Sequence, residues 1–135
     1  MSFILHPRLE ADTVPVKNLG LSRLLMMNDR TWPWLILVPE RADVREIHQL
    51  APADRLVLIE EIAYVGEILE RLFKPAKINV AALGNMVPQL HVHVIARFEN
   101  DPAWPKPVWG VCPPAPYEPQ ALLNRLRALH EVFDR

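Results

Sequence analysis

The stretch VPQLHVHVIARF, residues 87–98, places two histidines one residue apart inside an apolar run. Because side chains alternate between the two faces of a strand, Gln89, His91 and His93 are expected on one face. Only apolar side chains occupy the positions between and after them, so the other face must pack against the core. The pattern predicts a strand over 89–98 with two imidazoles side by side, about 6.5–7 Å apart at their Cα atoms.

Three more segments have the composition of strands. They cover 21–28, 34–38 and 77–83, and turn residues such as Pro33 and Gly84 separate them from their neighbours. Short apolar runs bounded by Gly, Pro and Asn are typical of strands joined in hairpins. We therefore expect an antiparallel sheet.

Apolar residues recur at helical spacing in two places, over 53–74 and over about 119–134, and a short helical turn is predicted within 42–50. Such spacing places the apolar side chains on one face of each helix. Hairpin strands with helices segregated along the chain predict an α+β domain. The two stripes are Leu58, Ile62, Val65, Leu69 and Leu72 in the long helix and Leu122, Leu126, Leu129 and Phe133 in the last one.

The chain has the composition of one globular domain. Its 135 residues are 50% apolar, and 15 Lys and Arg against 16 Asp and Glu give a net charge of −1. A domain of this length buries a core without disulfides, and Cys112 is the one cysteine. No basic stripe indicates a nucleic-acid partner, and no apolar run approaches a membrane span. Since the first residues lack the pattern of a secretion signal, we expect a single cytoplasmic domain over 1–135.

A proline-rich segment separates the histidine strand from the last helix. Residues 102–119 hold seven of the 14 prolines and two of the four tryptophans. This proline density excludes a regular helix or a central strand, and the segment is too apolar for a linker. We expect a stiff, ordered surface loop whose tryptophans pack on something specific.

Three interpretations of the histidine pair are open from the residues alone. The pair is two ordinary, partly exposed histidines on a polar sheet face, or part of a zinc site, or a phosphoryl-transfer site with one imidazole attacking and the other supporting. A zinc site needs further ligands, and His6, His48 and His130 have no useful spacing for it. No metal ligand set is therefore predicted.

The wider segment GNMVPQLHVHVIARF (84–98) resembles the signature of the histidine triad family, in which three histidines alternate with apolar residues. Upstream, NDRTWPWLILVPER (28–41) resembles the family's apolar strand that ends in proline and a basic residue. EIHQLAPAD (46–54) resembles its lead into the long helix. The resemblance covers about 20–98. It implies a sheet of about five antiparallel strands, one long helix and a C-terminal helix.

Members of that family are nucleotide hydrolases and transferases that act at an α-phosphate. The resemblance assigns the nucleophile to His91, which would form a nucleotidyl-histidine that water or another acceptor resolves. It assigns contacts with phosphate oxygens or the leaving group to His93. The implied substrate is a purine nucleoside phosphoramidate or a dinucleoside polyphosphate. No protein-bound cofactor is implied, although a polyphosphate substrate could carry a divalent cation.

The chain departs from the family pattern at three positions. Gln89 replaces the first histidine of the motif, Trp34 replaces a histidine upstream, and Met86 replaces a hydroxyl residue in the turn. Because Gln89 cannot titrate, we expect it to hold geometry in the catalytic site through its amide. These changes leave an alternative open, a nucleotide-binding or interaction module with little or no turnover.

Five residues are expected to bind substrate. Asn85 in the turn can donate to a phosphate, and the resemblance implies that Asn28, or else Asp29, holds the ribose hydroxyls. Asn28 could instead only initiate a turn. Since the proline-rich loop follows the histidine strand, Trp104 and Trp109 are expected to wall the site on the leaving-group side and face a second base. The alternative is that both tryptophans only seal the core or a dimer contact.

The resemblance also implies a homodimer, because the family pairs through the long helix and a sheet edge. An uncovered antiparallel edge favours such pairing. The long helix has apolar residues outside its main stripe, namely Val57, Ile59, Ala63 and Ile68.

Overall fold

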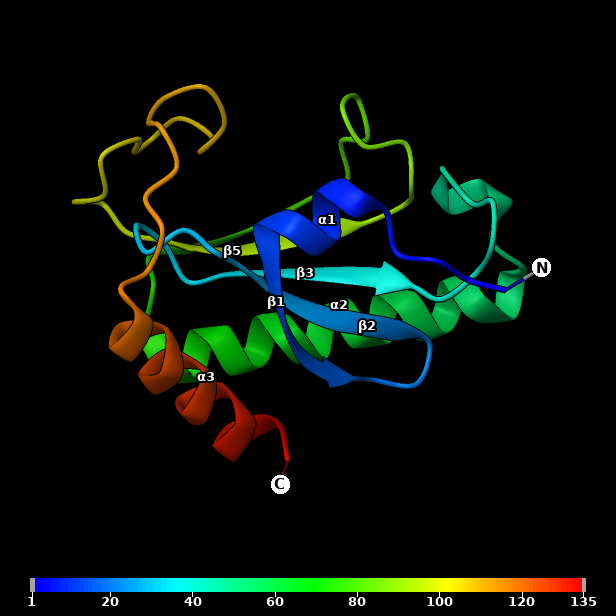
Figure 1. Ribbon diagram of the computed structural model, residues 1–135, viewed down its shortest axis with the longest axis horizontal. Helices are drawn as coiled ribbons and strands as arrows, with labels where there is room; N and C mark the ends of the chain where they lie inside the picture. The colour runs from blue at the N-terminus through cyan, green and yellow to red at the C-terminus, as the bar shows by residue number, and fades with distance from the viewer. Residues whose placement is uncertain (1, 135) are drawn as a thin grey trace.

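The structure is a computed structural model that describes residues 2–134. Its centre is a five-stranded antiparallel sheet in the order β1-β2-β3-β5-β4, flanked by helices (Figure 1). The expected α+β fold is therefore confirmed. The elements are α1 (Pro7–Asp12), β1 (Thr13–Asn18), β2 (Ser22–Met27), β3 (Trp34–Pro39), the 3-10 turn η1 (Ile47–Gln49), α2 (Pro52–Phe73), β4 (Lys77–Ala81), β5 (Val92–Arg97) and α3 (Pro119–Phe133).

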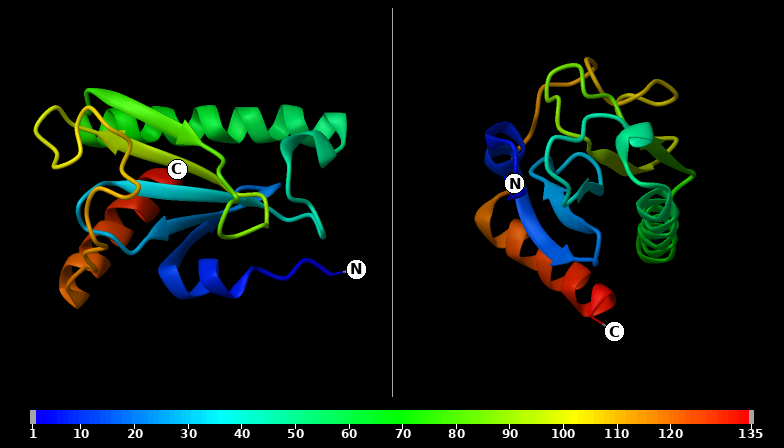
Figure 2. Two further views of the ribbon diagram at one scale, coloured as in Figure 1. Left: turned by 90° about the horizontal axis from the view of Figure 1, so that it is seen from above. Right: turned by 90° about the vertical axis from the view of Figure 1, so that its right-hand side faces the viewer.

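Both faces of the sheet are covered. Helices α2 and α3 lie on one face of the sheet. The other face is covered by α1, by residues 2–6 before it (the N-terminal segment) and by residues 98–118 (the loop after β5) (Figures 1 and 2). Successive residues of β3 pack on opposite faces of the sheet. Leu35 and Leu37 pack with α2, whereas Ile36 packs with Leu9 of α1. A strand buried on both faces must be apolar throughout, and all six residues of β3 are buried.

The strand that sequence patterning misses is β1, at the edge of the sheet. Its sequence TVPVKN contains a proline and polar residues, so it lacks the apolar run that marks β2 and β3. Proline is tolerated there because an edge strand pairs on one side only. The pairing with β2 shifts register between Pro15 and Lys17, which is a β-bulge.

Helix α2 follows the predicted stripe. Pro52 occupies its first turn, where no backbone donor is needed, and Lys74 ends it in a left-handed conformation with φ of 50°. Leu58, Val65 and Leu69 are buried as expected. Ile68, however, is 1% exposed and belongs to the core of this chain, so the expectation that it is available for dimer contacts is wrong.

The histidine strand is shorter than predicted. It begins at Val92, so Gln89 and His91 lie in the segment before it. The two imidazoles still lie side by side on the face opposite α2, with ring centroids 4.9 Å apart. His91 and His93 are only 6% and 5% exposed because the N-terminal segment and the later loop cover this face. The interpretation as partly exposed histidines on a polar face is therefore wrong.

A buried ion pair fixes the start of the loop after β5. Nε and Nη2 of Arg97 donate to the two carboxylate oxygens of Asp101 at 2.9 and 3.0 Å, and the two side chains are 2% and 4% exposed. Asp101 also accepts backbone N–H groups of Phe98, Ala103 and Trp104. Burial alone would raise the pKa of Asp101, but these hydrogen bonds hold it well below its usual range.

We expect Asp101→Ala to lower the free energy of unfolding by about 3–5 kcal/mol, because it leaves the Arg97 guanidinium buried without a carboxylate. Urea unfolding followed by circular dichroism measures the loss. Glu40→Ala is the matched control, since Arg23 and Glu40 form a pair of the same 2.9 Å length with both side chains about one third exposed. That control should cost no more than about 1 kcal/mol; equal losses in the two variants would contradict a special role for the buried pair.

Candidate active site

His91 presents one ring nitrogen for chemistry. Its Nδ1 lies 2.7 Å from the backbone carbonyl oxygen of Gln89. Since a carbonyl only accepts, Nδ1 carries the proton of the neutral ring and Nε2 keeps its lone pair. Burial is the main cause that lowers the pKa of His91; the Gln89 carbonyl opposes this, and the charge of His6 adds to it. His91 is therefore neutral and nucleophilic at neutral pH.

His93 is held in the opposite tautomer. The indole N–H of Trp34 donates to Nδ1 of His93 at 3.0 Å, so the proton of the neutral ring lies on Nε2. Burial, with a smaller contribution from the charge of His91, lowers the pKa of His93 to about 3. His93 therefore offers a fixed N–H donor next to the lone pair of His91.

Tryptophans extend the row of imidazoles. The ring of His93 lies 5.0 Å from that of Trp109 and 5.7 Å from that of Trp34. Trp34 in turn contacts Trp32 and Trp109 edge to face. These large apolar rings exclude water from one side of His93, which strengthens the electrostatic interactions of its ring.

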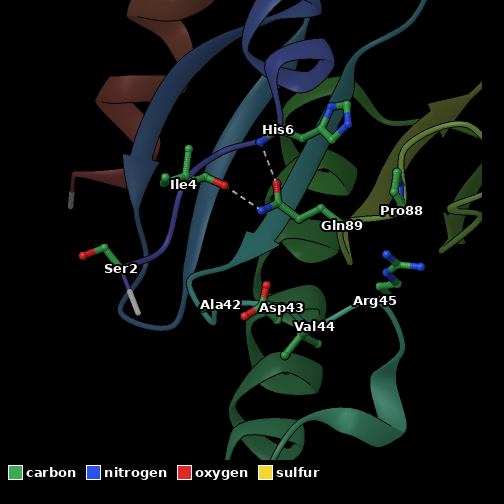
Figure 3. A pocket seen from close by; sticks show the side chains of 9 residues that line it. All are labelled: Ser2, Ile4, His6, Ala42, Asp43, Val44, Arg45, Pro88 and Gln89. Carbon is green, nitrogen blue, oxygen red and sulfur yellow. Dashed lines mark hydrogen bonds between the residues drawn. The ribbon is translucent and has the colours of Figure 1, made fainter.

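The side chain of Gln89 points toward the N-terminal segment, residues 4–6 (Figure 3). Its Oε1 accepts the backbone N–H of His6 and its Nε2 donates to the carbonyl of Ile4, both at 2.8 Å. The amide expected to hold geometry in the catalytic site thus holds the N-terminal segment. The contact of Gln89 with His91 comes from its backbone carbonyl.

A cavity of about 500 Å³ lies beyond the tryptophans. We call it the tryptophan cavity; its lining includes Asn28, Asp29, Trp32, Trp34 and Trp109. The structure thus brings both expected ribose ligands next to the histidine-bearing face. Oδ1 of Asn28 accepts the backbone N–H of Tyr117, and Oδ1 of Asp29 accepts that of Thr31 at 3.0 Å each.

Two further hollows lie on the other side of the histidines. The N-terminal cavity, about 500 Å³, is lined by Ser2, Ile4, His6, 42–45, Pro88 and Gln89 (Figure 3). A smaller cavity of about 180 Å³ shares Arg45 and Gln89 with it and also includes His91 in its wall. Gly84 lines this smaller cavity, and the next residue, Asn85, is exposed in the turn.

The two loop tryptophans have different surroundings. Trp109 lines the tryptophan cavity and contacts His93, whereas Trp104 lies over the guanidinium of Arg97, 5.9 Å from ring centroid to Cζ. They do not form one wall, and Trp109 lies on the same side as Asn28 rather than across the histidines from it. The expectation of a shared wall on the leaving-group side is corrected in this respect.

Within residues 2–134, no group of three or more His, Cys, Asp or Glu side chains is placed to hold a metal ion. In the same part of the chain, no helix is both long and apolar enough to cross a membrane.

Comparison with known proteins agrees with this α+β domain and its paired imidazoles. The HIT domain family model matches residues 8–100. A histidine triad protein of Marinobacter aquaeolei VT8 is 46% identical with a TM-score of 0.96, covering 99% of this chain and 98% of its own. A histidine triad protein of Bradyrhizobium japonicum is 44% identical with a TM-score of 0.94, and the match covers 97% of this chain and 98% of that one. A histidine triad protein of Sinorhizobium meliloti 1021 is 47% identical with a TM-score of 0.92, and the match covers 96% of each chain. No curated protein gives a match.

The fold and site define an α+β domain with a pair of buried neutral imidazoles on one face of its sheet. The chain belongs to the histidine triad (HIT) family, since the family model spans more than half of it and close structural relatives carry the family's name. Family membership implies, in general, a nucleotide hydrolase or transferase.

Sequence reasoning missed two features of the site. One is the hydrogen bond from Trp34 to His93, because the family pattern marks Trp34 only as the loss of an imidazole. The other is the hydrogen bond from the backbone N–H of His6 to the side chain of Gln89, which lies 83 residues away in the chain. No local signal indicated the second feature, because only the fold brings these two residues together.

The free energy of unfolding should fall as the pH drops from 7 to 5. The pKa of His93 in the folded protein is about 3, against an ordinary value of 6.5 for histidine. Its contribution to stability is therefore present above pH 6.5 and lost progressively between pH 6.5 and 3. At pH 5 this one group accounts for a loss of about 2 kcal/mol. Urea titrations at both pH values measure it, and His93→Asn should show a smaller decrease. An unchanged pH dependence in that variant would show that His93 does not carry the effect.

Proposed function

We propose that the protein is a cytoplasmic nucleotide hydrolase or nucleotidyl transferase that acts at an α-phosphate through a nucleotidyl-His91 intermediate. One observation carries the proposal. The hydrogen bond from Nδ1 of His91 to the Gln89 carbonyl leaves the Nε2 lone pair as the buried nucleophile.

In the first step, Nε2 of His91 attacks the α-phosphorus. The N–P bond forms while the bond from phosphorus to the leaving group breaks, and the leaving group departs with that electron pair. An amine leaving group takes up a proton from solvent as it departs, whereas a phosphate can leave as the anion. The ring becomes a nucleotidyl-imidazolium, whose Nδ1–H faces the Gln89 carbonyl oxygen at 2.7 Å. That carbonyl dipole stabilises the new positive charge. The fixed Nε2–H of His93 donates to a phosphoryl oxygen as negative charge develops there.

In the second step, water or another acceptor attacks the same phosphorus. The N–P bond breaks, its electron pair returns to Nε2 of His91, and the nucleotide leaves. With water, the released proton goes to solvent or to the nucleoside monophosphate. No protein-bound cofactor enters either step, and a divalent cation could arrive with a polyphosphate substrate.

The tryptophan cavity suits the nucleoside. A purine can stack on a flat apolar surface such as the half-buried Trp109, and Asn28 and Asp29 offer polar atoms for the ribose hydroxyls. The leaving group then lies on the opposite side of His91, toward the smaller cavity beside Gly84 and Asn85. The proposed substrate is a purine nucleoside phosphoramidate or a dinucleoside polyphosphate.

His91→Ala should abolish turnover of a fluorogenic adenosine phosphoramidate, because no other group forms the covalent bond. His93→Ala should retain activity reduced by about 10²–10³, the usual cost of one lost stabilising donor. Mass spectrometry after an acid-free quench should find the nucleotide adduct on His91. An adduct on His93, or activity in His91→Ala, overturns the assignment.

The alternative function is a nucleotide-binding module with little or no turnover. It is favoured by the turn, where Met86 is 79% exposed and cannot donate to a phosphate. Binding of adenosine monophosphate by the wild-type protein with no turnover and no adduct would select this alternative.

Trp109→Ala should weaken substrate binding, because Trp109 lines the tryptophan cavity and contacts His93. Trp104→Ala is the matched comparison from the same loop, and it should instead lower the melting temperature because Trp104 covers buried Arg97. Steady-state kinetics and thermal unfolding on both variants separate the two roles. Equal effects of the two substitutions on KM would place Trp109 outside the nucleoside site.

The protein is also proposed to be a homodimer. Leu56, Val57 and Ile59 on α2 are 69%, 44% and 57% exposed, and Val80 on the edge strand β4 is 52% exposed. Light scattering at micromolar concentration should give about twice the 15.5 kDa of the chain. Ile59→Glu should reduce this mass toward the monomer, whereas Leu123→Glu, at an exposed site on α3, should not. A wild-type mass near 15.5 kDa would exclude the dimer.

A further inference from the structure

The N-terminal segment is attached to the histidine motif through one side chain. The amide of Gln89 spans the backbone of residues 4–6, accepting from His6 N–H and donating to the Ile4 carbonyl at 2.8 Å each (Figure 3). This is a two-point contact of the kind that two paired strands make. It fixes the position of His6 on the sheet face that also carries His91 and His93.

A second hydrogen bond fixes the orientation of the His6 ring. His6 is the N-cap of α1, and its Nδ1 accepts the backbone N–H of Arg8 at 3.1 Å. Pro7 has no N–H, so Arg8 supplies the first backbone donor of the helix. Because Nδ1 accepts, the proton of the neutral His6 ring lies on Nε2. His6 therefore presents a donor at the far end of its ring.

His6 lines a cavity that shares two of its residues with the cavity bordered by His91. His6 and Gln89 line the N-terminal cavity, and Gln89 also lines the smaller cavity that His91 borders. The electrostatic effect of His6 is the smallest of the three influences on the pKa of His91, and it lowers that pKa. Arg45 lines both cavities and provides a cation on this side of His91.

We propose that His6 is a catalytic residue that supplies the third imidazole of the site, and that Gln89 is the positioning residue that holds it there. Nε2–H of His6 donates a hydrogen bond to a phosphate or leaving-group oxygen on the side of His91 away from the tryptophans. No proton is transferred, since a neutral imidazole that lost this proton would become an anion. The proposal rests on the proposed function and adds a residue from outside the family motif.

The central variant is His6→Asn. Asparagine is a good N-cap, so its Oδ1 can still accept from Arg8 while the distant N–H donor is lost. We expect the melting temperature to stay within about 2 °C and kcat/KM for the adenosine phosphoramidate to fall about 10²-fold or more, as for one lost donor to developing charge. His130→Ala, an exposed histidine of α3, is the control and should keep wild-type kinetics.

A double-mutant cycle tests the role of Gln89. Gln89→Leu keeps the approximate size of the side chain and removes both hydrogen bonds to residues 4–6. If Gln89 acts through His6, the double variant with His6→Asn should be no slower than the slower single variant. Losses that simply add would show that Gln89 does not position His6. Free imidazole should also restore part of the activity of His6→Ala, which a structural role would not allow.

Binding separates this proposal from the proposed function. Calorimetry should show that the wild-type protein binds adenosine monophosphate more tightly than adenosine, and that His6→Asn removes most of this difference while leaving adenosine affinity unchanged. If the wild-type protein shows no turnover, the proposed enzyme activity fails, but this binding result would still support His6 as a phosphate ligand. If His6→Asn retains turnover within threefold of wild type, or retains the binding difference, the role of His6 is overturned.

Discussion

The site depends on the burial of two neutral imidazoles in opposite tautomers. His91 donates from Nδ1 to the Gln89 carbonyl, and His93 accepts at Nδ1 from Trp34. In water such bonds would exchange freely, but here both rings are almost fully covered and an unmade bond would cost the desolvation of a ring nitrogen. One ring therefore offers a lone pair and the other an N–H, side by side and without any charge that substrate binding must displace.

This arrangement requires a sheet covered on both faces. Layers of helix on one face only would leave the histidines in solvent, where they would titrate near neutrality. The second cover consists of α1, the N-terminal segment and the loop after β5, and the Arg97–Asp101 pair anchors that loop where it leaves the sheet. The stability of the loop and the reactivity of the histidines are thus linked, because the loop places Trp109 against His93.

The strand β5 and the helices α2 and α3 could be predicted because their apolar residues follow the period of each element. The strands β2, β3 and β4 could be predicted because each is a short run between turn residues. The edge strand β1 could not, since its proline and polar residues are allowed only by its position in the sheet. The pairing of His91 with His93 also followed from alternation. Their burial, the hydrogen bond from Trp34 and the direction of the Gln89 amide depend on contacts between residues far apart in sequence, which no local pattern encodes.

The geometry offers a physical reason for glutamine at position 89. To hold residues 4–6, one side chain must accept from the His6 N–H and donate to the Ile4 carbonyl at the same time. A primary amide has its donor and acceptor on neighbouring atoms and matches a peptide backbone in spacing. A neutral imidazole carries them on opposite sides of a ring and cannot make both bonds to one short segment. A histidine here would add a titratable group but lose its hold on the N-terminal segment, and with it the placement of the His6 ring.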